Sequence, residues 1–184
     1  LKGKKGNLLE VGVGNREKTK RFIKMGFNVY GCDIHLEPGI KIKQLKMVFA
    51  DVSKDKIPFS YSFFDVIICT EVLEHLENYH HALREFNRLI KKEGILIIST
   101  PNVVSILQRI YYLFKGEFRK FQMPPEKYGH ITPIPLYILK DRIINNGFKI
   151  KKIHFVRNIL PILRIKMPSS KYFGDGVIIY SIKE

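Results

Sequence analysis

The sequence predicts an α/β fold, a three-layer sandwich around a mostly parallel, seven-stranded sheet that ends in an antiparallel hairpin. Three observations lead to this prediction. Short apolar runs typical of buried strands alternate along the chain with amphipathic segments of helical period, and the connections are short. A turn that contains two glycines joins the first strand to the first helix. The last two strand segments have no helical pattern between them, which indicates a hairpin with a long loop.

The strands and helices follow in order along the chain. The first strand is the apolar run from Leu8 to Val11, and the next helix takes in the run from Glu17 to Met25. Asn146-Gly147-Phe148 ends the last helix, because glycine supplies the left-handed conformation that closes a helix. Right-handed crossovers place helices on both faces of the sheet. We expect strands near residues 7–11, 28–32, 46–50, 64–69, 94–99, 148–157 and 177–183, and helices near residues 16–25, 79–91, 103–114 and 134–146.

The turn after the first strand and the acid after the second strand indicate a nucleoside pocket. Gly12 and Gly14 let the backbone turn tightly beside a ligand, and Asp33 ends the run that forms the second strand. At the carboxyl edge of a parallel sheet this acid can accept both hydroxyls of a ribose. The alternative role for Asp33 is to cap the turn that follows it.

The residues of this loop decide between nucleoside cofactors. A dinucleotide fingerprint has a third glycine for close helix–sheet packing, and Glu17 occupies that position. A carboxylate there repels a pyrophosphate at the helix N-terminus, which disfavours NAD and FAD. Glu10, an acid ahead of the glycines, suits a ligand with a positive charge and an amino acid tail, such as S-adenosylmethionine. Because a bare buried carboxylate is costly, we expect Glu10 to bond to loop amides or to the ligand's ammonium group.

Over nearly its whole length the chain resembles the class I S-adenosylmethionine-dependent methyltransferases, and is similar to the subgroup that modifies quinones, sugars and other small molecules. The segments that carry the resemblance, in family order, are Glu10-Val11-Gly12-Val13-Gly14, Asp33, Ala50-Asp51-Val52, Ile57-Pro58-Phe59, Phe63-Phe64-Asp65-Val66-Ile67-Ile68, Glu71-Val72-Leu73-Glu74-His75-Leu76 and the run from Ile90 to Asn102. The resemblance implies a Rossmann-like fold in a single domain over residues 1–184. It also implies S-adenosyl-L-methionine as cofactor and S-adenosyl-L-homocysteine as product.

The resemblance assigns residues to the cofactor as well. The cofactor-binding set that it implies is Glu10, Gly12, Gly14, Asp33, Ile34, Asp51, Val52 and Thr70. Asp51 is expected near the adenine amino group, and its alternative role is to cap the Ser53-Lys54-Asp55 turn. The chain departs from the family pattern where Arg16 replaces a third glycine. That side chain either crowds the methionine portion of the cofactor or pairs with its carboxylate.

Two residues after the fourth strand are the catalytic candidates. Methyl transfer from an activated cofactor mainly requires alignment of the acceptor and, for a hydroxyl, removal of its proton. His75 is the best candidate for the base, because histidine titrates near neutral pH, and its alternative role is packing or capping. Glu71 is the second candidate, with the alternative that it only shapes the methionine pocket. We expect transfer to oxygen rather than to nitrogen or carbon.

The segment 115–135 is rich in aromatic residues and proline and resembles the substrate-covering region of the family. Long irregular insertions of this kind usually serve as lids or binding loops. Tyr128 and His130 are therefore candidate substrate contacts, with ordinary loop packing as the alternative. The amphipathic loop 158–176 either packs on the sheet edge or meets a membrane surface or a greasy acceptor. No cluster of Cys, His and Asp has metal-ligand spacing, so no metal is expected.

The composition leaves the acceptor open. Lys and Arg number 32 against 17 acidic residues, a net charge of +15, but they are spread along the chain as on a generally lysine-rich surface. A small-molecule acceptor, with anionic or lipid-like ones among the options, is therefore favoured over nucleic acid. A nucleic-acid (RNA) methyltransferase and a noncatalytic S-adenosylmethionine-binding module stay open as alternatives. The sequence does not indicate an oligomeric state.

Two further features bear on location. Cys32 and Cys69 lie inside apolar strand runs, which favours buried free thiols in a reducing compartment. No apolar run approaches the length of a transmembrane helix, so stable membrane insertion is not expected. These features predict a cytoplasmic protein.

Overall fold

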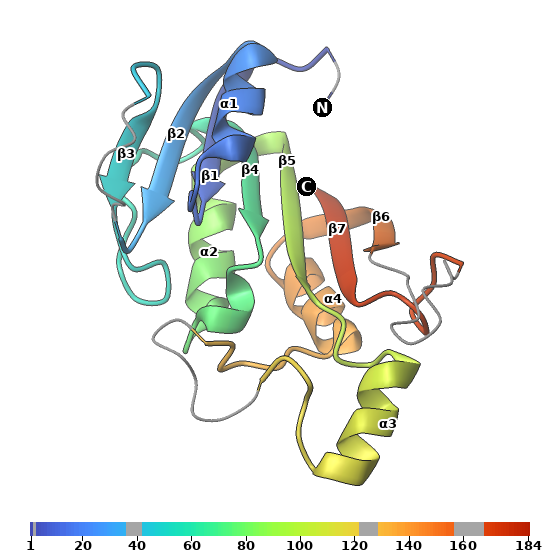
Figure 1. Cartoon of the computed structure of the whole chain (residues 1–184). Helices are drawn as coiled ribbons and strands as arrows, with labels where there is room; N and C mark the ends of the chain where they lie inside the picture. The colour runs from blue at the N-terminus through green and yellow to red at the C-terminus, as the bar shows by residue number, and fades with distance from the viewer. Residues whose placement is uncertain (2, 36–41, 122–128, 157–167) are drawn as a thin grey trace.

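The computed structural model describes residues 1, 3–35, 42–121, 129–156 and 168–184. Its centre is a seven-stranded sheet with the strand order β3-β2-β1-β4-β5-β7-β6 (Figure 1). The first five strands of this order run parallel, and β7 runs antiparallel to both of its neighbours. The predicted fold class, including the antiparallel hairpin at the end of the sheet, is confirmed.

The elements lie close to the predicted ranges. In chain order they are β1 (Gly6–Val11), α1 (Glu17–Lys24), β2 (Phe27–Asp33), β3 (Lys46–Phe49), β4 (Phe64–Thr70), the 3-10 helix η1 (Leu73–His75), α2 (Tyr79–Leu89), β5 (Ile90–Pro101), α3 (Ile106–Lys115), α4 (Leu136–Asn145), β6 (Phe148–Val156) and β7 (Gly176–Lys183). Gly147 closes α4 with a φ of 80°, as the sequence predicts.

Two apolar clusters pack on opposite faces of the sheet and make the sandwich. Because successive side chains of a strand point to opposite faces, Leu8 enters one cluster and Leu9 the other. Helix α1 covers the first face with Phe22 and Ile23. Helices α2 and α4 cover the second face, where the side chains they bury are Ala82, Leu83, Phe86, Leu89, Leu139 and Ile143. Helix α3 belongs to neither layer and projects beyond the carboxyl ends of the parallel strands (Figure 1).

Most helix boundaries differ from the prediction by one or two residues, and two of the differences have a visible cause. The helix expected over 79–91 ends at Leu89, because Ile90 already pairs with Phe64 of β4. The pairing then skips, since the next strand pair is Val66 with Ile95, and Glu93 takes a left-handed φ of 61° in the bulge between them. The helix expected over 103–114 begins only at Ile106, after Ser105 caps its first turn through Gln108 N.

Cys32 and Cys69 are buried free thiols, as predicted. In the part of the chain that the structure describes, no helix combines the length and hydropathy needed to cross a bilayer.

Candidate active site

A cavity of about 430 Å³ opens at the carboxyl ends of β1, β2 and β4. Its size lies within the range of small-ligand sites. Four segments contribute its walls: the glycine turn with Arg16, the end of β2, the region of β3 and the loop after it, and the turn after β4. The lining residues are Val11, Gly12, Val13, Gly14, Arg16, Cys32, Asp33, Ile34, His35, Met47, Ala50, Val52, Val72, His75 and Leu76. This is the crevice in which the sequence analysis expected a nucleoside.

The two glycines of the turn serve different purposes. Gly12 has a φ of 73° and donates its N–H to Cys32 O at 2.9 Å. A Cβ at Gly12 would lie 2.3 Å from Cγ2 of Val72, so the turn after β4 can approach only a glycine. Gly14 has a φ of 48°, and a Cβ there would meet none of the described atoms within 4 Å. Gly14 therefore keeps open the space in front of the turn.

Asp33 ends β2 and turns its carboxylate back onto the glycine turn. Its Oδ2 accepts the N–H of Val13 at 2.9 Å and, at a longer 3.4 Å, that of Gly14. Its Oδ1 accepts the N–H of His35 at 3.2 Å. These bonds hold the carboxylate at the cavity wall, where Oδ1 keeps a second lone pair for a ligand hydroxyl and only the long bond from Gly14 occupies the second lone pair of Oδ2. The capping role that the sequence analysis left open and a ribose-binding role are thus compatible.

Glu10 lies behind the turn and does not line the cavity. Its side chain is fully buried, and Oε2 accepts a hydrogen bond from the hydroxyl of Thr19 on α1. Burial raises the pKa of this carboxyl, and the bond from Thr19 partly opposes the rise. Of the two expected partners, loop amides and the ligand's ammonium group, the first is not found in the described chain: Thr19 of α1 bonds Oε2, and Oε1 has no hydrogen bond. A bond to the ligand stays a prediction.

Three other residues of the predicted cofactor-binding and catalytic sets are not among those that line the cavity. Asp51 accepts the N–H and the hydroxyl of Ser53 at 2.9 and 2.6 Å, which is the turn-capping role left open by the sequence. Thr70 accepts a hydrogen bond from Lys18. Glu71 accepts the hydroxyl of Ser99 at 2.9 Å. Their roles toward a cofactor or acceptor stay predictions, whereas Gly12, Gly14, Asp33, Ile34, Val52 and His75 all line the cavity.

His75 reaches the cavity from the 3-10 turn after β4. Its Nδ1 lies 3.1 Å from the carbonyl oxygen of Gly129. A carbonyl can only accept, so in the neutral ring Nδ1 carries the proton and Nε2 keeps its lone pair. The backbone of the inserted segment, residues 115–135, thus holds the proton of the neutral His75 ring on Nδ1 and leaves Nε2 able to accept a proton.

Glu74, the residue before His75, is a site residue that the sequence analysis did not single out. Its side chain is fully buried, and within the described chain neither carboxylate oxygen makes a hydrogen bond of normal geometry. Burial raises its pKa to about 7, and the nearby charge of Glu71 adds to the rise. A carboxyl with a pKa near neutrality beside a cavity is typical of functional sites. The signal in the sequence was an acid directly before the candidate base, in an otherwise apolar turn.

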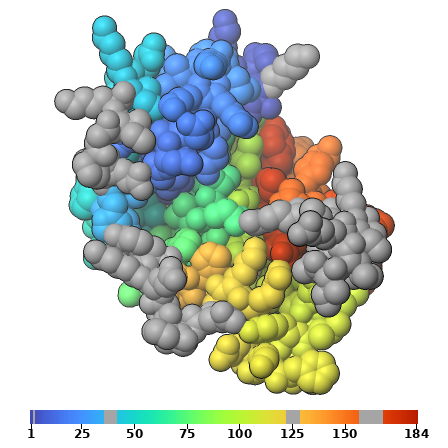
Figure 2. Space-filling view, in the orientation of Figure 1, coloured from blue at the N-terminus to red at the C-terminus, as the bar shows by residue number. Residues whose placement is uncertain are grey.

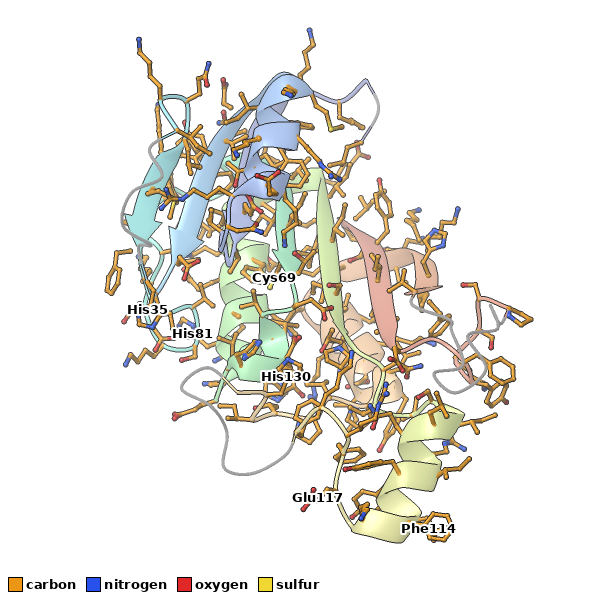
Figure 3. The ribbon with its side chains drawn as sticks, in the orientation of Figure 1. His35, Cys69, His81, Phe114, Glu117 and His130 are labelled. Carbon is orange, nitrogen blue, oxygen red and sulfur yellow. The ribbon has the colours of Figure 1, made fainter. Side chains whose placement is uncertain are left out.

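His130 joins this pair from the inserted segment. Its ring centroid lies 4.7 Å from that of His75, and its Nε2 lies 3.9 Å from Oε1 of Glu74. Figure 3 places His130 under the lower end of α2, on the side of the carboxyl ends of the strands. The N–H groups of Ile131 and Thr132 both donate to Glu74 O at 2.9 Å, which fixes this part of the segment against η1. Tyr128, the other predicted substrate contact, lies outside the described residues.

The cluster bears on the expectation that no metal binds. The sequence shows no metal-ligand spacing, but the fold brings one ligand atom each of Glu74, His75 and His130 within 4.8 Å of one another. Imidazole nitrogens with a carboxylate oxygen are a donor set that zinc and similar divalent cations accept. These side chains could therefore hold a cation, while the absence of a metal stays a prediction.

Comparison with known proteins gives one family and a set of named relatives. Residues 1–153 match the family model described as a methyltransferase domain. The ubiquinone biosynthesis O-methyltransferase of Rickettsia bellii is 30% identical over 162 residues, covering 75% of this chain and 65% of that protein. The enzyme of that name from Actinobacillus pleuropneumoniae is 30% identical over 148 residues, covering 68% and 62%. This chain thus spans somewhat less than two thirds of the length of these relatives.

Solved structures share the fold. A SAM-dependent methyltransferase from Archaeoglobus fulgidus superimposes with a TM-score of 0.73 at 18% identity, covering 99% of this chain and 87% of that chain. The 1,6-didemethyltoxoflavin-N1-methyltransferase of Burkholderia thailandensis, solved with bound 1,6-didemethyltoxoflavin and S-adenosylhomocysteine, gives a TM-score of 0.64 at 15% identity, covering 96% of this chain and 70% of that chain. At these identities the likeness extends to the fold alone.

Proposed function

This chain belongs to the methyltransferase domain family, and from that premise we propose that it transfers a methyl group from S-adenosylmethionine to a hydroxyl group of a small-molecule acceptor. The observation that carries the proposal is the position of Asp33. Its carboxylate stands at the end of β2 beside the glycine turn, at the wall of a cavity of about 430 Å³. An acid in that place suits the two hydroxyls of a ribose.

The residues around the cavity fit this cofactor. Asp33 would accept the ribose hydroxyls, and the apolar side chains of Ile34 and Val52 would flank the adenine. The open space in front of Gly14 suits the methionine portion, where the cationic side chain of Arg16 lines the wall and is only 6% exposed. When bound, the cofactor supplies a methyl group that is already activated by its positive sulfur.

The site also offers what an oxygen acceptor needs. Nε2 of His75 can take the proton of a hydroxyl, because Gly129 O holds the proton of the neutral ring on Nδ1. The relatives named O-methyltransferases support oxygen as the methylated atom and a small molecule as the acceptor. A nucleic-acid acceptor receives less support, since among the described residues that line the cavity Arg16 is the one Lys or Arg.

Calorimetric titration tests the cofactor. The chain should bind S-adenosylmethionine and S-adenosylhomocysteine saturably and should not bind NAD. Asp33→Ala should weaken binding by tenfold or more, on the order of 1.4 kcal/mol, because hydrogen bonds to a charged group are lost. Asp141→Ala, at an exposed position of α4, is the matched control. Binding that Asp33→Ala leaves unchanged would refute the assignment of the cavity.

Methyl transfer to a panel of phenolic acceptors tests the base. His75→Gln should lower the rate of transfer by about a hundredfold or more while the affinity for S-adenosylmethionine stays within about threefold. His154→Gln, on the exposed face of β6, should change neither quantity. Unchanged transfer by His75→Gln would remove His75 from the reaction, and cofactor binding without transfer to any acceptor would favour the noncatalytic module.

A further inference from the structure

Helix α3 is built with its apolar residues outward. Gln108 is its one fully buried side chain within the described structure, while Leu113 is 77% and Phe114 79% exposed. Its other exposed apolar side chains are Ile106, Ile110 and Tyr112. Contiguous apolar surface of this kind marks an interaction site in proteins that are stable in water. Figure 3 shows Phe114 at the far end of α3, pointing away from the body of the molecule.

Polar contacts join α3 to the rest of the described chain. Oε1 of Gln108 accepts the N–H of Arg119 at 3.0 Å, and the Arg119 guanidinium pairs with Asp175 at 2.6 Å. At the start of the helix, the N–H of Ile106 donates to Tyr172 O at 2.8 Å. Beside these contacts, Ile110, Leu113 and Phe114 stay exposed in the described structure. In the space-filling view α3 forms the yellow-green lower end of the molecule (Figure 2).

Charge indicates which partner covers this surface. Arg109 and Lys115 are exposed on α3 itself, against a single exposed acid, Glu117, in the turn that follows. The chain as a whole carries a net charge of +15. A second copy would bring two strongly basic molecules together, whereas an anionic surface would attract both the helix and the protein behind it. Apolar residues flanked by Lys and Arg are the pattern of helices that lie in a membrane interface.

We propose that α3 docks on the surface of a lipid bilayer that contains anionic headgroups. The apolar side chains around Leu113 and Phe114 enter the headgroup region, and Arg109 and Lys115 meet the lipid phosphates. The protein stays peripheral, because a helix of 10 residues is far too short to span the bilayer.

A line of ring contacts joins this surface to the candidate active site. Tyr112 of α3 contacts Phe118 at a centroid distance of 5.0 Å, and Phe118 contacts Phe121 at 6.1 Å. Phe121 contacts His130 at 5.1 Å, and His130 contacts His75 at 4.7 Å. If the proposed function holds, this apolar line favours an acceptor that carries a lipid-like chain and enters from the bilayer; the docking itself does not depend on the reaction.

Vesicle co-sedimentation tests the docking. The chain should sediment with phosphatidylcholine vesicles that contain phosphatidylglycerol and should stay in solution with pure phosphatidylcholine. Leu113→Ser/Phe114→Ser should lower the binding by at least about tenfold, because two exposed apolar side chains are lost. Tyr137→Ser/Ile144→Ser is a matched control, since it removes two exposed apolar side chains from α4. Far-ultraviolet circular dichroism and S-adenosylmethionine binding, expected unchanged in both variants, separate this test from that of the reaction.

Three results would overturn the proposal. The first is a wild-type chain that stays in solution with anionic vesicles. The second is a wild-type chain that binds neutral vesicles equally well. The third is a Leu113→Ser/Phe114→Ser variant that binds anionic vesicles as well as the wild type does. A dimer seen by light scattering that Leu113→Ser/Phe114→Ser dissolves, without any vesicle binding, would assign the surface to a second copy instead.

Discussion

At the scale of single residues, Arg16 is the position where the sequence departs from the glycine pattern of the family that it resembles. It takes a left-handed φ of 61° directly before α1, where the family has a glycine, yet its side chain is only 6% exposed and lines the cavity. A left-handed conformation costs a non-glycine residue roughly 1–2 kcal/mol. Because this side chain lines the cavity, a carboxylate is the ligand group that suits it best.

Arg16→Gly should therefore weaken S-adenosylmethionine binding by about tenfold, which corresponds to a charged hydrogen bond. The same variant should leave the affinity for 5′-methylthioadenosine unchanged, because that ligand has no carboxylate. Calorimetry with both ligands makes the comparison. If the arginine instead crowds the methionine portion, Arg16→Gly will bind S-adenosylmethionine more tightly than the wild type does.

The raised pKa of Glu74 predicts how stability depends on pH. The folded value of about 7 stands above the ordinary 4.5, so folding takes up a proton between these values. The contribution of Glu74 is thus fully present below pH 4.5 and is lost as the pH rises through about 7, a difference on the order of 3 kcal/mol. Between pH 5 and 8 the free energy of unfolding, measured with urea, should therefore fall more in the wild type than in Glu74→Gln.

Glu74→Gln is the reference because it keeps the shape of the side chain and cannot ionise. Glu10, whose pKa is also raised, contributes equally to both proteins and cancels in the difference. Parallel pH profiles for the two proteins would show that Glu74 does not titrate with folding in this range. A divalent cation held by the Glu74, His75 and His130 cluster would favour the ionised carboxylate, so the measurement is made with and without a chelator.

At the scale of elements, the turn after β1 and the turn after β4 depend on one close contact. Gly12→Ala should lower the free energy of unfolding by about 2–4 kcal/mol, from the left-handed backbone and the overlap with Val72. Gly12→Ala/Val72→Ala should recover part of this loss, because the overlap goes while the backbone strain remains. Gly14→Ala, with open space around it, should cost only about 1 kcal/mol. Equal losses in the two glycine variants, measured by urea unfolding, would contradict the contact.

The parts of the fold that the sequence predicts are those encoded locally. The glycine turn, the acid at the end of β2 and the cap at Gly147 can each be recognised from a few consecutive residues, and all lie where the sequence predicts them, although their partners can be distant in the chain. The early start of β5 could not be predicted, because Ile90 is a strand residue only through its pairing with Phe64.

In the candidate site, too, the residues placed by local sequence patterns were predictable and those placed by long-range contacts were not. His75 follows a strand and so falls at the cavity by local rules. The cluster of Glu74, His75 and His130 depends on backbone bonds from Ile131 and Thr132 to Glu74 O, which connect segments far apart in the chain. No spacing in the sequence encodes such a contact. Asp51 is a second case that the sequence could not decide. An acid at this place in the sequence fits both a turn cap and an adenine contact, and the structure shows the bonds of the cap.

At the scale of the whole molecule, the excess of 32 basic over 17 acidic residues should make folding sensitive to salt. Like charges repel one another in the compact state, and exposed ion pairs such as Lys149–Glu184 offset little of this repulsion. Raising KCl from about 0.01 to 0.15 M shortens the Debye length from about 30 to about 8 Å. The free energy of unfolding should therefore rise with salt, by on the order of 1 kcal/mol.

Lys151→Gln/Lys152→Gln supplies the comparison, because both lysines are exposed on β6 and the double variant lowers the net charge by two. Its stability should rise less steeply with KCl than that of the wild type. The urea midpoint measured at several KCl concentrations gives both slopes. A wild-type midpoint that falls with KCl would mean that the ion pairs outweigh the repulsion, and attraction to an anionic bilayer would then depend on the basic residues of α3 rather than on the charge of the whole protein.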